Sequence, residues 1–287
     1  MRKLEIPTQN FDLKETLTCG QTFNWNRLKG ELYGEGSNKF YTFRNGKPLI
    51  AHQQKQTLFV ETELSRAEVE KALGLDHSLE QVFSRFPEDK KLEKAYQEFQ
   101  GLRIVQDEFF PTLISYLLSP QMRIPRIKQT RDRIAEKYGE TVEHNGYELK
   151  RFPTQEQLAK VSEQEFRDLG AGYRAKYIAE TMKILENSFK TEQLDSLSYS
   201  EAKQRLKQLY GVGDKVADCV LLFSLGFHEA TPLDTWAKKA LKQHYPQLHS
   251  DDYAETVENL QNRFGEKAGY AVEYLFHAAR QDVLETG

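Results

Sequence analysis

The chain has 287 residues, 39% hydrophobic and 29% charged, an ordinary composition for a globular protein with a sizeable core. No apolar run approaches the ~20 residues of a membrane helix, and residues 1–10 lack the apolar segment of a secretory signal. Two cysteines are too few for a disulfide framework or a four-cysteine iron–sulfur cluster. We therefore expect a cytoplasmic protein whose net charge of −3 leaves any nucleic-acid contact to a local basic patch.

Residues 1 to about 65 have the texture of an antiparallel sheet. Short aromatic and β-branched runs, such as Phe40–Phe43 and Leu58–Val60, alternate with turn signals. Asn45-Gly46 is a good two-residue hairpin turn. This part of the chain is therefore predicted to be mainly strands.

The pattern becomes helical at Ser65, which forms a capping box with Glu68. Helices are expected over residues 65–73, 78–86, 88–99 and 107–118, and the last of them is strongly apolar. Thr154 and Ser162 cap two further short helices. The predicted fold class is α+β, with an N-terminal domain of residues 1–100 that holds the antiparallel sheet and short helices, followed by a mainly α-helical region of residues 101–287.

Residues 119–133 form the most basic stretch of the chain. A single acidic residue, Asp132, stands against five basic ones: Arg123, Arg126, Lys128, Arg131 and Arg133. Taken alone, such a run indicates a solvated helix face.

The stretch from Leu209 to Cys219 (LYGVGDKVADC) lies between two helical patterns. Gly211 and Gly213 interrupt the helix and permit backbone angles that other residues resist, so we predict a helix–hairpin–helix at about residues 201–225. Such a hairpin exposes backbone N–H groups at the start of the second helix. Those groups form an anion site that suits a DNA phosphate.

Two residues near the hairpin carry chemistry. Lys215 lies in the first turn of the second helix, where a lysine can act as a nucleophile. Asp234 precedes an amphipathic pattern and is predicted to be an N-cap. A carboxylate held by backbone N–H groups stays ionised and suits the stabilisation of nearby positive charge.

These residues resemble those of a known family. The run Leu209–Cys219, followed by Pro232-Leu233-Asp234, is similar to the helix-hairpin-helix DNA glycosylase superfamily, specifically its 8-oxoguanine branch. The resemblance implies a base-excision-repair glycosylase with AP lyase activity that removes 8-oxoguanine opposite cytosine from duplex DNA. Lys215 would attack C1′ of the sugar to give a Schiff base, and Asp234 would stabilise the oxocarbenium-like sugar. No cofactor is required, although the hairpin carbonyls could hold a monovalent cation.

The resemblance also implies a base pocket. The Gly20 carbonyl would accept the N7–H that only the oxidised base carries, Cys219 and Phe276 would stack on its two faces, and Pro232 and Val272 would also line the pocket. Valine at 272 departs from the family, which typically has a glutamine there for the Watson–Crick edge of the base. Glu273 is adjacent if the register shifts.

DNA contacts follow from the same resemblance. Gln121 would fill the gap left by the extruded base, and Arg126 would contact the orphaned cytosine. Tyr173, in the segment LGAGYRAKY, would insert between bases as a wedge, and Arg174 would be the second cytosine contact. The family usually has asparagines near Gln121, so this segment is a departure.

Two other functions stay open at this point. An alkylpurine glycosylase of the 3-methyladenine type is favoured by the less polar pocket that Val272 would give. Lys215 disfavours it, because such enzymes activate water and do not need this lysine. A non-catalytic module that only binds damaged DNA would need neither Lys215 nor Asp234.

The expected partner is double-stranded DNA that contains a damaged base, with no membrane contact. The seven histidines show no metal-ligand spacing, so no metal site is expected. The protein is expected to act as a monomer in the cytoplasm, and to associate with the nucleoid through DNA if it is prokaryotic.

Overall fold

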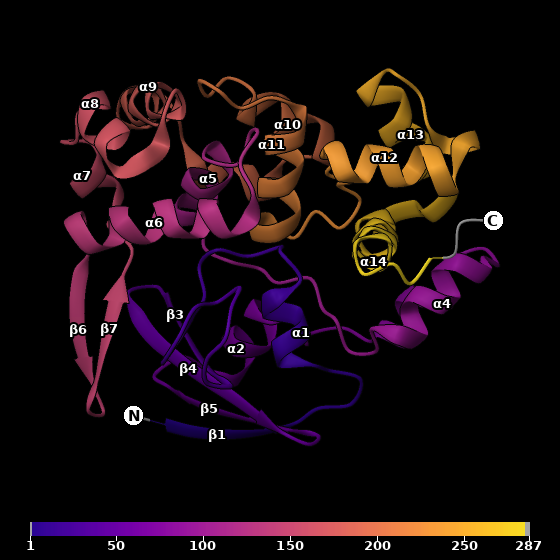
Figure 1. Ribbon diagram of the computed structural model, residues 1–287, viewed down its shortest axis with the longest axis horizontal. Helices are drawn as coiled ribbons and strands as arrows, with labels where there is room; N and C mark the ends of the chain where they lie inside the picture. Colours follow the sequence, from indigo (N-terminus) through magenta and orange to yellow (C-terminus); the bar gives the residue numbers. More distant parts are fainter. Residues whose placement is uncertain (1, 285–287) are drawn as a thin grey trace.

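The structure, a computed structural model, describes residues 2–284 and has the predicted α+β architecture. One antiparallel sheet lies below a layer of helices, with α5 and α6 between the sheet and an upper row that contains α9, α10 and α11 (Figure 1). Helices α12, α13, α14 and α4 gather at one end of the molecule. Helix α4, from the first part of the chain, therefore lies beside helices from the last part.

The sheet has five strands in the order β1-β5-β4-β3-β2. Neighbouring strands pair antiparallel throughout, and β1 pairs with β5 from Arg2↔Thr62 to Pro7↔Thr57. Asn45-Gly46 joins β3 to β4 as predicted, with Arg44 opposite Lys47. The strands are β1 (Arg2–Pro7), β2 (Asn26–Arg27), β3 (Lys39–Arg44), β4 (Lys47–Gln54) and β5 (Thr57–Thr62).

Two elements differ from the prediction. Helix α1 (Leu13–Thr18) interrupts the region predicted to be mainly strands, and the Asp12 side chain caps it by accepting a hydrogen bond from the Glu15 N–H at 2.8 Å. A second hairpin, β6 (Glu140–His144) with β7 (Tyr147–Arg151), follows α6. Its Asn145-Gly146 turn repeats the dipeptide of the first hairpin, so the signal for it was present in the sequence.

The helices begin and end close to their predicted bounds. Capping boxes form at Ser65, Thr154 and Ser162, which confirms those three predictions. The helices of the first half are α2 (Arg66–Ala72), α3 (Leu79–Phe83), α4 (Lys90–Glu98), α5 (Phe109–Leu117) and α6 (Ile124–Tyr138). Those of the second half are α7 (Gln155–Leu158), α8 (Glu163–Phe166), α9 (Arg174–Asn187), α10 (Tyr199–Leu206), α11 (Asp214–Val220), α12 (Thr235–His244), α13 (Tyr253–Phe264) and α14 (Ala268–Arg280).

The hydrophobic core has a sheet cluster and a larger helical cluster. Trp25 belongs to the sheet cluster, whereas Cys19 and Phe23, only a few residues away, pack into the helical one. The segment from α1 to β2 therefore passes between the two clusters. The boundary at about residue 100 stays a prediction, since Val105 still packs against the sheet.

Segment 102–107 ties the sheet to the helices. The Arg103 guanidinium, 5% exposed, donates to the carbonyls of Gly74 and His77 at 3.1 and 2.7 Å. The Tyr274 hydroxyl of α14 donates to the Leu102 carbonyl at 2.7 Å. These buried polar contacts fix α14 relative to the N-terminal part of the chain.

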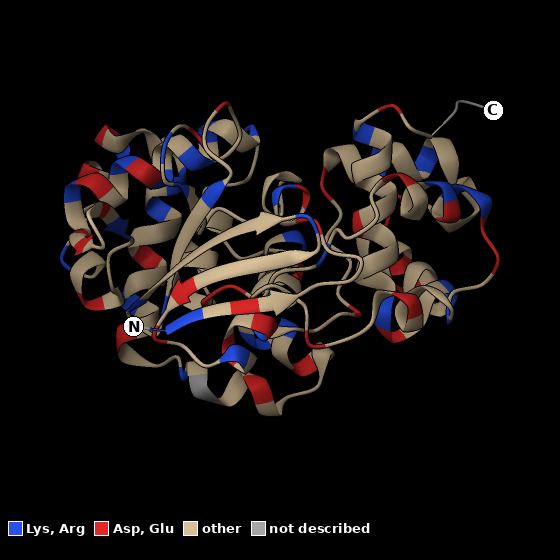
Figure 2. Cartoon of the chain, turned by 90° about the horizontal axis from the view of Figure 1, so that it is seen from below, with Lys and Arg blue, Asp and Glu red and all other residues tan. Residues whose placement is uncertain are grey.

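Acidic and basic side chains are mixed over much of the surface. Figure 2, which views the molecule from below the sheet, shows both signs interspersed along the strands and the surrounding helices. Within residues 2–284, no helix combines the length and the apolar character needed to cross a bilayer.

Candidate active site

The predicted hairpin is present between α10 and α11. The Val212 N–H donates to the Leu209 carbonyl at 3.1 Å and closes the turn. Gly211 has φ +84°, and a Cβ at that position would lie 2.5 Å from Cγ of Tyr177. Only glycine fits there, because both the backbone angle and the contact with Tyr177 exclude a side chain.

Gly213 has a different role from Gly211. Its φ of −92° lies in the extended region that any residue adopts, so the prediction that it supplies a special backbone angle is wrong. A Cβ built at Gly213 meets no atom within 4 Å, and the residue is exposed as the N-cap of α11. Because no side chain covers Gly213, the start of α11 is open to an approaching group. The binding of a monovalent cation by the hairpin carbonyls stays a prediction.

Lys215 is partly exposed in the first turn of α11. Its Nζ donates to the Ser119 hydroxyl at 3.1 Å and lies 5.0 Å from the centre of the Tyr116 ring. Both contacts come from α5 or the residues just after it. These contacts could not be predicted from the sequence, because Ser119 lies 96 positions before Lys215 along the chain.

Asp234 caps α12 as predicted. One carboxylate oxygen accepts a hydrogen bond from the Ala237 N–H at 2.7 Å, and the residue is exposed. The preceding Leu233 is buried, and its N–H donates to the Tyr253 hydroxyl at 3.3 Å. The carboxylate is therefore held at a defined place at the helix start.

Asp218, which was not predicted from the sequence as a functional residue, holds α11 and the segment before Asp234 together. It is fully buried and accepts hydrogen bonds from Lys203 Nζ at 2.9 Å and from the hydroxyls of Tyr199 and Tyr253 at 2.7 and 2.6 Å. Burial raises the pKa of Asp218, and the Lys203 ammonium opposes that rise. Because Tyr253 also binds the Leu233 backbone, the network links α11 to the segment that carries Asp234.

Cys219 lies one helical turn after Lys215 and is 2% exposed. Burial raises the pKa of its thiol to about 12, and the Lys215 ammonium opposes that rise. The thiol is therefore neutral at physiological pH. Its predicted place against one face of the base stays a prediction, as does the place of the partly exposed Phe276 on α14.

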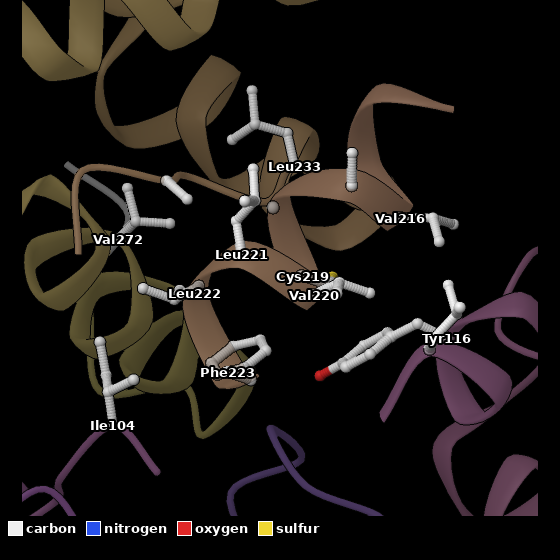
Figure 3. Packing of buried hydrophobic residues seen from close by; sticks show 14 of the residues in the cluster. Ile104, Tyr116, Val216, Cys219, Val220, Leu221, Leu222, Phe223, Leu233 and Val272 are labelled. Atoms are coloured by element: carbon white, nitrogen blue, oxygen red, sulfur yellow. The ribbon is translucent and has the colours of Figure 1, made fainter. Parts of the chain in front are cut away.

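Val272 is a core residue. It is 1% exposed and packs in the helical cluster near Leu221 and Leu222 (Figure 3). Its place at the base pocket stays a prediction, as for the equally buried Cys219. The next residue, Glu273, is partly exposed, and its surroundings include Cys19, Arg280 and Asp234.

Gly20 occupies a position that only glycine can fill. Its φ is +110°, and an added Cβ would lie 2.8 Å from Ile124 Cδ1 and 3.0 Å from Arg280 Nη1. The Arg280 guanidinium also donates to the Cys19 carbonyl. Gly20 is thus placed where the N-terminal segment meets the start of α6 and the end of α14, while its role toward a base stays a prediction.

We call residues 209–220 together with Asp234 the hairpin wall. The pocket wall, which we name for the base pocket predicted there, consists of Cys19, Gly20, Glu273, Phe276 and Arg280. Pro232, predicted to line the base pocket, is partly buried just before Asp234.

The two loops predicted to contact DNA are joined in the structure. Gln121 is exposed with φ +54°, and Tyr173 is 42% exposed. The Tyr173 hydroxyl donates to the Pro120 carbonyl at 3.3 Å. Arg174 is 7% exposed, and its Nε donates to the same carbonyl at 2.6 Å. The contact of Arg174 with a cytosine stays a prediction.

An aromatic ladder connects the predicted wedge to the hairpin. The Tyr173 and Tyr177 ring centres are 5.6 Å apart, and those of Tyr177 and Tyr210 are 5.9 Å apart. Tyr210, directly before Gly211, is 41% exposed. The wedge and the hairpin are therefore packed as one unit.

The basic stretch 119–133 divides into buried and exposed residues. Lys128 and Arg131 are buried, Lys128 against Asp132 and Asn26, and Arg131 over the Phe152 ring at 4.4 Å. Burial lowers the pKa of Lys128 to about 8, although the Asp132 carboxylate opposes this. Arg126 is exposed on the same helix and is free to contact a nucleic acid.

The described part of the chain contains no group of three or more His, Cys, Asp or Glu side chains placed to hold a metal ion. Cys19 and Cys219 are both buried free thiols.

Comparisons with known proteins agree with this arrangement. Residues 114–266 match the family described as HhH-GPD superfamily base excision DNA repair protein, and residues 3–113 match the 8-oxoguanine DNA glycosylase N-terminal domain. A probable N-glycosylase/DNA lyase of Methanothermobacter thermautotrophicus is 29% identical, over 98% of this chain and 97% of the relative. An N-glycosylase/DNA lyase of Saccharomyces cerevisiae is 30% identical, over 85% and 70% respectively.

Solved structures are similar over the whole chain. The 8-oxoguanine glycosylase/lyase of Clostridium acetobutylicum, in complex with duplex DNA that has cytosine opposite 8-oxoguanine, superposes with a TM-score of 0.84 at 28% identity and 99% coverage of both chains. A 3-methyladenine DNA glycosylase from Archaeoglobus fulgidus superposes with a TM-score of 0.78 at 21% identity, over 98% of this chain and all of that one. The second likeness is one of fold alone.

Proposed function

The chain belongs to the HhH-GPD superfamily of base excision DNA repair proteins, and from that premise we propose that it removes 8-oxoguanine opposite cytosine from duplex DNA and then cleaves the strand. It is an enzyme with DNA glycosylase and AP lyase activities. The relatives that align over most of the chain carry the name N-glycosylase/DNA lyase, and the N-terminal part matches the 8-oxoguanine branch.

One observation carries the proposal. Lys215 and Asp234 each stand at the start of a helix, and the Asp218 network joins those two helices through Tyr253. Lys215 is held on Ser119 and the Tyr116 ring while remaining partly exposed. A damaged-DNA binder would need neither residue in such a fixed arrangement.

The reaction begins with a bent duplex and an extruded base, which costs a few kcal/mol. The Lys215 amine attacks C1′ of the sugar, a new C–N bond forms, and the bond from C1′ to the base breaks. The base leaves with the electron pair and takes up a proton. Asp234 stabilises the positive charge that develops on the sugar as the base departs.

The lyase step uses the covalent intermediate. Loss of protons from Nζ and opening of the sugar ring give a Schiff base between Lys215 and C1′. Removal of a proton from C2′ then allows the C3′–O bond to break, and the 3′ phosphate leaves. Only the side chains of the protein take part, so the reaction needs no cofactor.

The test is borohydride trapping on three labelled duplexes. They carry 8-oxoguanine opposite cytosine, 8-oxoguanine opposite adenine, and a 3-methyladenine analogue, and base release is followed in parallel. We expect a trapped complex mainly with the first duplex. Base release from alkylated DNA without trapping would contradict the proposal.

The alkylpurine alternative has less support than the 8-oxoguanine function. The N-terminal part of the chain matches the 8-oxoguanine branch. The likeness to the Archaeoglobus enzyme extends to the fold only. Lys215 keeps its contacts to Ser119 and Tyr116, which a water-activating enzyme does not require.

We also propose that the enzyme acts as a monomer in the cytoplasm, associated with the nucleoid through DNA if it is prokaryotic. Catalytic and pocket residues all come from one chain, so a second copy is not needed to complete the site. Light scattering should give the mass of one chain for the free protein, and the mass of one chain plus one duplex for its complex with DNA.

A further inference from the structure

A cavity of about 530 Å³ lies at the junction between the two parts of the chain. Its wall is shared by β3 and the start of α5, which belong to residues 3–113, and by α6, β7 and the start of α7, which belong to residues 114–266. Ligand sites prefer such junctions and have volumes of about 300–1,000 Å³. The cavity therefore has the place and the size of a small-molecule site.

This cavity is separate from the hairpin wall and the pocket wall. Among the described residues that line it there is no member of either wall and no residue predicted to contact DNA. Figure 1 shows β7 and α7 at the end of the molecule opposite α12 and α14. A molecule bound in the cavity would therefore leave the predicted catalytic groups uncovered.

Four phenylalanine rings form much of the apolar part of the wall. All four are partly exposed, and they belong to Phe43, Phe109, Phe110 and Phe152. Rings gathered around one cavity leave apolar surface in contact with water, and a flat aromatic ligand would cover that surface. This part of the wall therefore suits a planar ring system.

A buried guanidinium gives the wall a fixed positive charge. Arg131 is 3% exposed, its Nη2 donates to the Asn24 side-chain oxygen at 3.0 Å, and its Cζ lies 4.4 Å from the centre of the Phe152 ring. Its Nε–H has no hydrogen-bond partner within the part of the chain that the structure describes. Buried donors are usually satisfied, so this N–H is available to an acceptor on a ligand.

The nearby carboxylates do not bind Arg131 at hydrogen-bond distance. Its ion-pair partner Asp132 is 3.9 Å from Nη1 and accepts a hydrogen bond from Lys128 instead. Glu108, in the cavity wall, accepts a hydrogen bond from the Asn45 N–H. A buried cation whose nearest carboxylate is shared with another cation is stabilised by an anionic ligand.

The other charges of the wall are paired or solvated. Two basic residues form ion pairs, Lys150 with Glu136 at 3.3 Å and Arg151 with Glu140 at 2.8 Å. Two acidic residues are exposed, Glu156 and Asp195. Because one buried guanidinium balances one negative charge, a carboxylate fits better than a phosphate dianion, whose second charge would lie against apolar rings.

We propose that this cavity binds a small aromatic carboxylate, with the carboxylate on the Arg131 guanidinium and the ring system against the phenylalanine rings. One carboxylate oxygen accepts the Nε–H that has no partner in the protein. Asn24 and Phe152 already hold the guanidinium, so binding requires little further ordering of this side chain. The inference goes beyond the proposed function and does not depend on it.

The test uses 2-naphthoate as the probe and isothermal titration calorimetry as the measurement. Two further compounds serve as controls, because 2-naphthamide has the same rings without the charge and cyclohexanecarboxylate has the charge without an aromatic ring. The proteins are the wild type, Arg131→Met, Phe110→Ala and the matched control Arg133→Met, at an exposed arginine of the same helix. Each titration is repeated with a bound duplex that contains a tetrahydrofuran abasic-site analogue.

One molecule of 2-naphthoate should bind per chain, at least about 10-fold more tightly than either control compound. Arg131→Met should weaken this binding about 10- to 100-fold and Phe110→Ala about 3- to 10-fold. Arg133→Met and the bound duplex should leave it unchanged. Circular dichroism checks the fold of each variant, and Phe110→Ala decides the outcome if Arg131→Met does not fold.

Several results would overturn the inference. These are no saturable binding of 2-naphthoate, equal affinity for the acid and the amide, and unchanged binding in Phe110→Ala. An equal loss in Arg133→Met and Arg131→Met would indicate general attraction to the basic stretch, and loss of binding in the presence of the duplex would place the probe at the DNA-binding face. None of these titrations measures base release, so each of these results leaves the proposed function intact.

Discussion

The hairpin wall and the pocket wall are built in different ways. The hairpin wall comes mainly from one continuous stretch, and its key contacts are turns and helix starts. The pocket wall joins the first twenty residues of the chain to the last helix, through contacts such as Arg280 on the Cys19 carbonyl. We infer that the hairpin wall provides the reacting groups, which can act on many bases, and that the pocket wall determines which base is excised.

The largest effect is expected from Lys215→Gln in the hairpin wall. Loss of the nucleophile should lower base release at least about 10³-fold for every substrate and abolish borohydride trapping, while DNA binding remains. Lys207→Gln is the matched control, since Lys207 pairs with Asp214 at 2.8 Å beside the hairpin but is not aimed at the sugar. Undiminished trapping by Lys215→Gln would mean that another amine is the nucleophile.

Alanine substitutions of the two hairpin glycines test how the hairpin wall is held in its conformation. Gly211→Ala should lower the free energy of unfolding by about 2–4 kcal/mol, because of its positive φ and the contact with Tyr177. Gly213→Ala should change it by less than about 1 kcal/mol, since nothing lies near its Cβ. Urea denaturation measures both. Equal losses would show that the Tyr177 contact does not hold the hairpin.

Asp107 lies where the segment around Thr22 meets Phe223, which follows α11 in the chain. Its carboxylate accepts a hydrogen bond from the Thr22 hydroxyl at 2.5 Å, and its N–H donates to the Phe223 carbonyl at 2.8 Å. Burial raises the pKa of Asp107 from its ordinary 3.8 to about 6, against the opposing effect of the Thr22 hydrogen bond. The folded state therefore binds this proton more tightly than the unfolded state does.

The Asp107 contribution to the free energy of unfolding should fall as the pH rises from about 4 to about 6, by up to about 3 kcal/mol, and stay low above that range. Asp107→Asn should remove this fall, so its stability relative to the wild type should rise across the same interval. Parallel stability–pH curves for the two proteins would contradict the placement of this carboxyl.

The smallest effect is expected from Arg174→Ala. The guanidinium binds the Pro120 carbonyl in the free protein, and it is predicted to contact the cytosine opposite the lesion. We expect the preference for cytosine over adenine opposite the lesion to fall about 10-fold, with the choice of excised base unchanged. Arg167→Ala, on an exposed arginine of the same loop region, is the control. If the preference for cytosine over adenine is unchanged, Arg174 only holds the two loops together and does not contact the opposite base.

Local features of the site were predictable from the sequence. The capping boxes at Ser65 and Ser162 and the N-cap at Asp234 depend on hydrogen bonds that span three residues, so their geometry follows from neighbouring residue types. The need for glycine at position 211 could be predicted for the same reason, because it depends on the backbone of the local turn. The Asn145-Gly146 hairpin was equally local and could have been predicted.

The surroundings of Val272 could not be predicted from the sequence. Helix α14 is buried on most of its circumference, so its hydrophobic pattern does not mark one face as the core. A shift of one residue rotates a side chain by about 100°. Only the packed helix shows that Val272 lies near Leu222.

The sequence by itself determined the fold class and the hairpin, because short-range backbone geometry specifies them, and together with the family resemblance it predicted Lys215 and Asp234 as the reacting pair. Only the tertiary structure decided that Ser119 and Tyr116 contact the lysine and that Arg280 lies against Gly20. Contacts between distant segments depend on how whole helices pack, and no local pattern of residues encodes that packing.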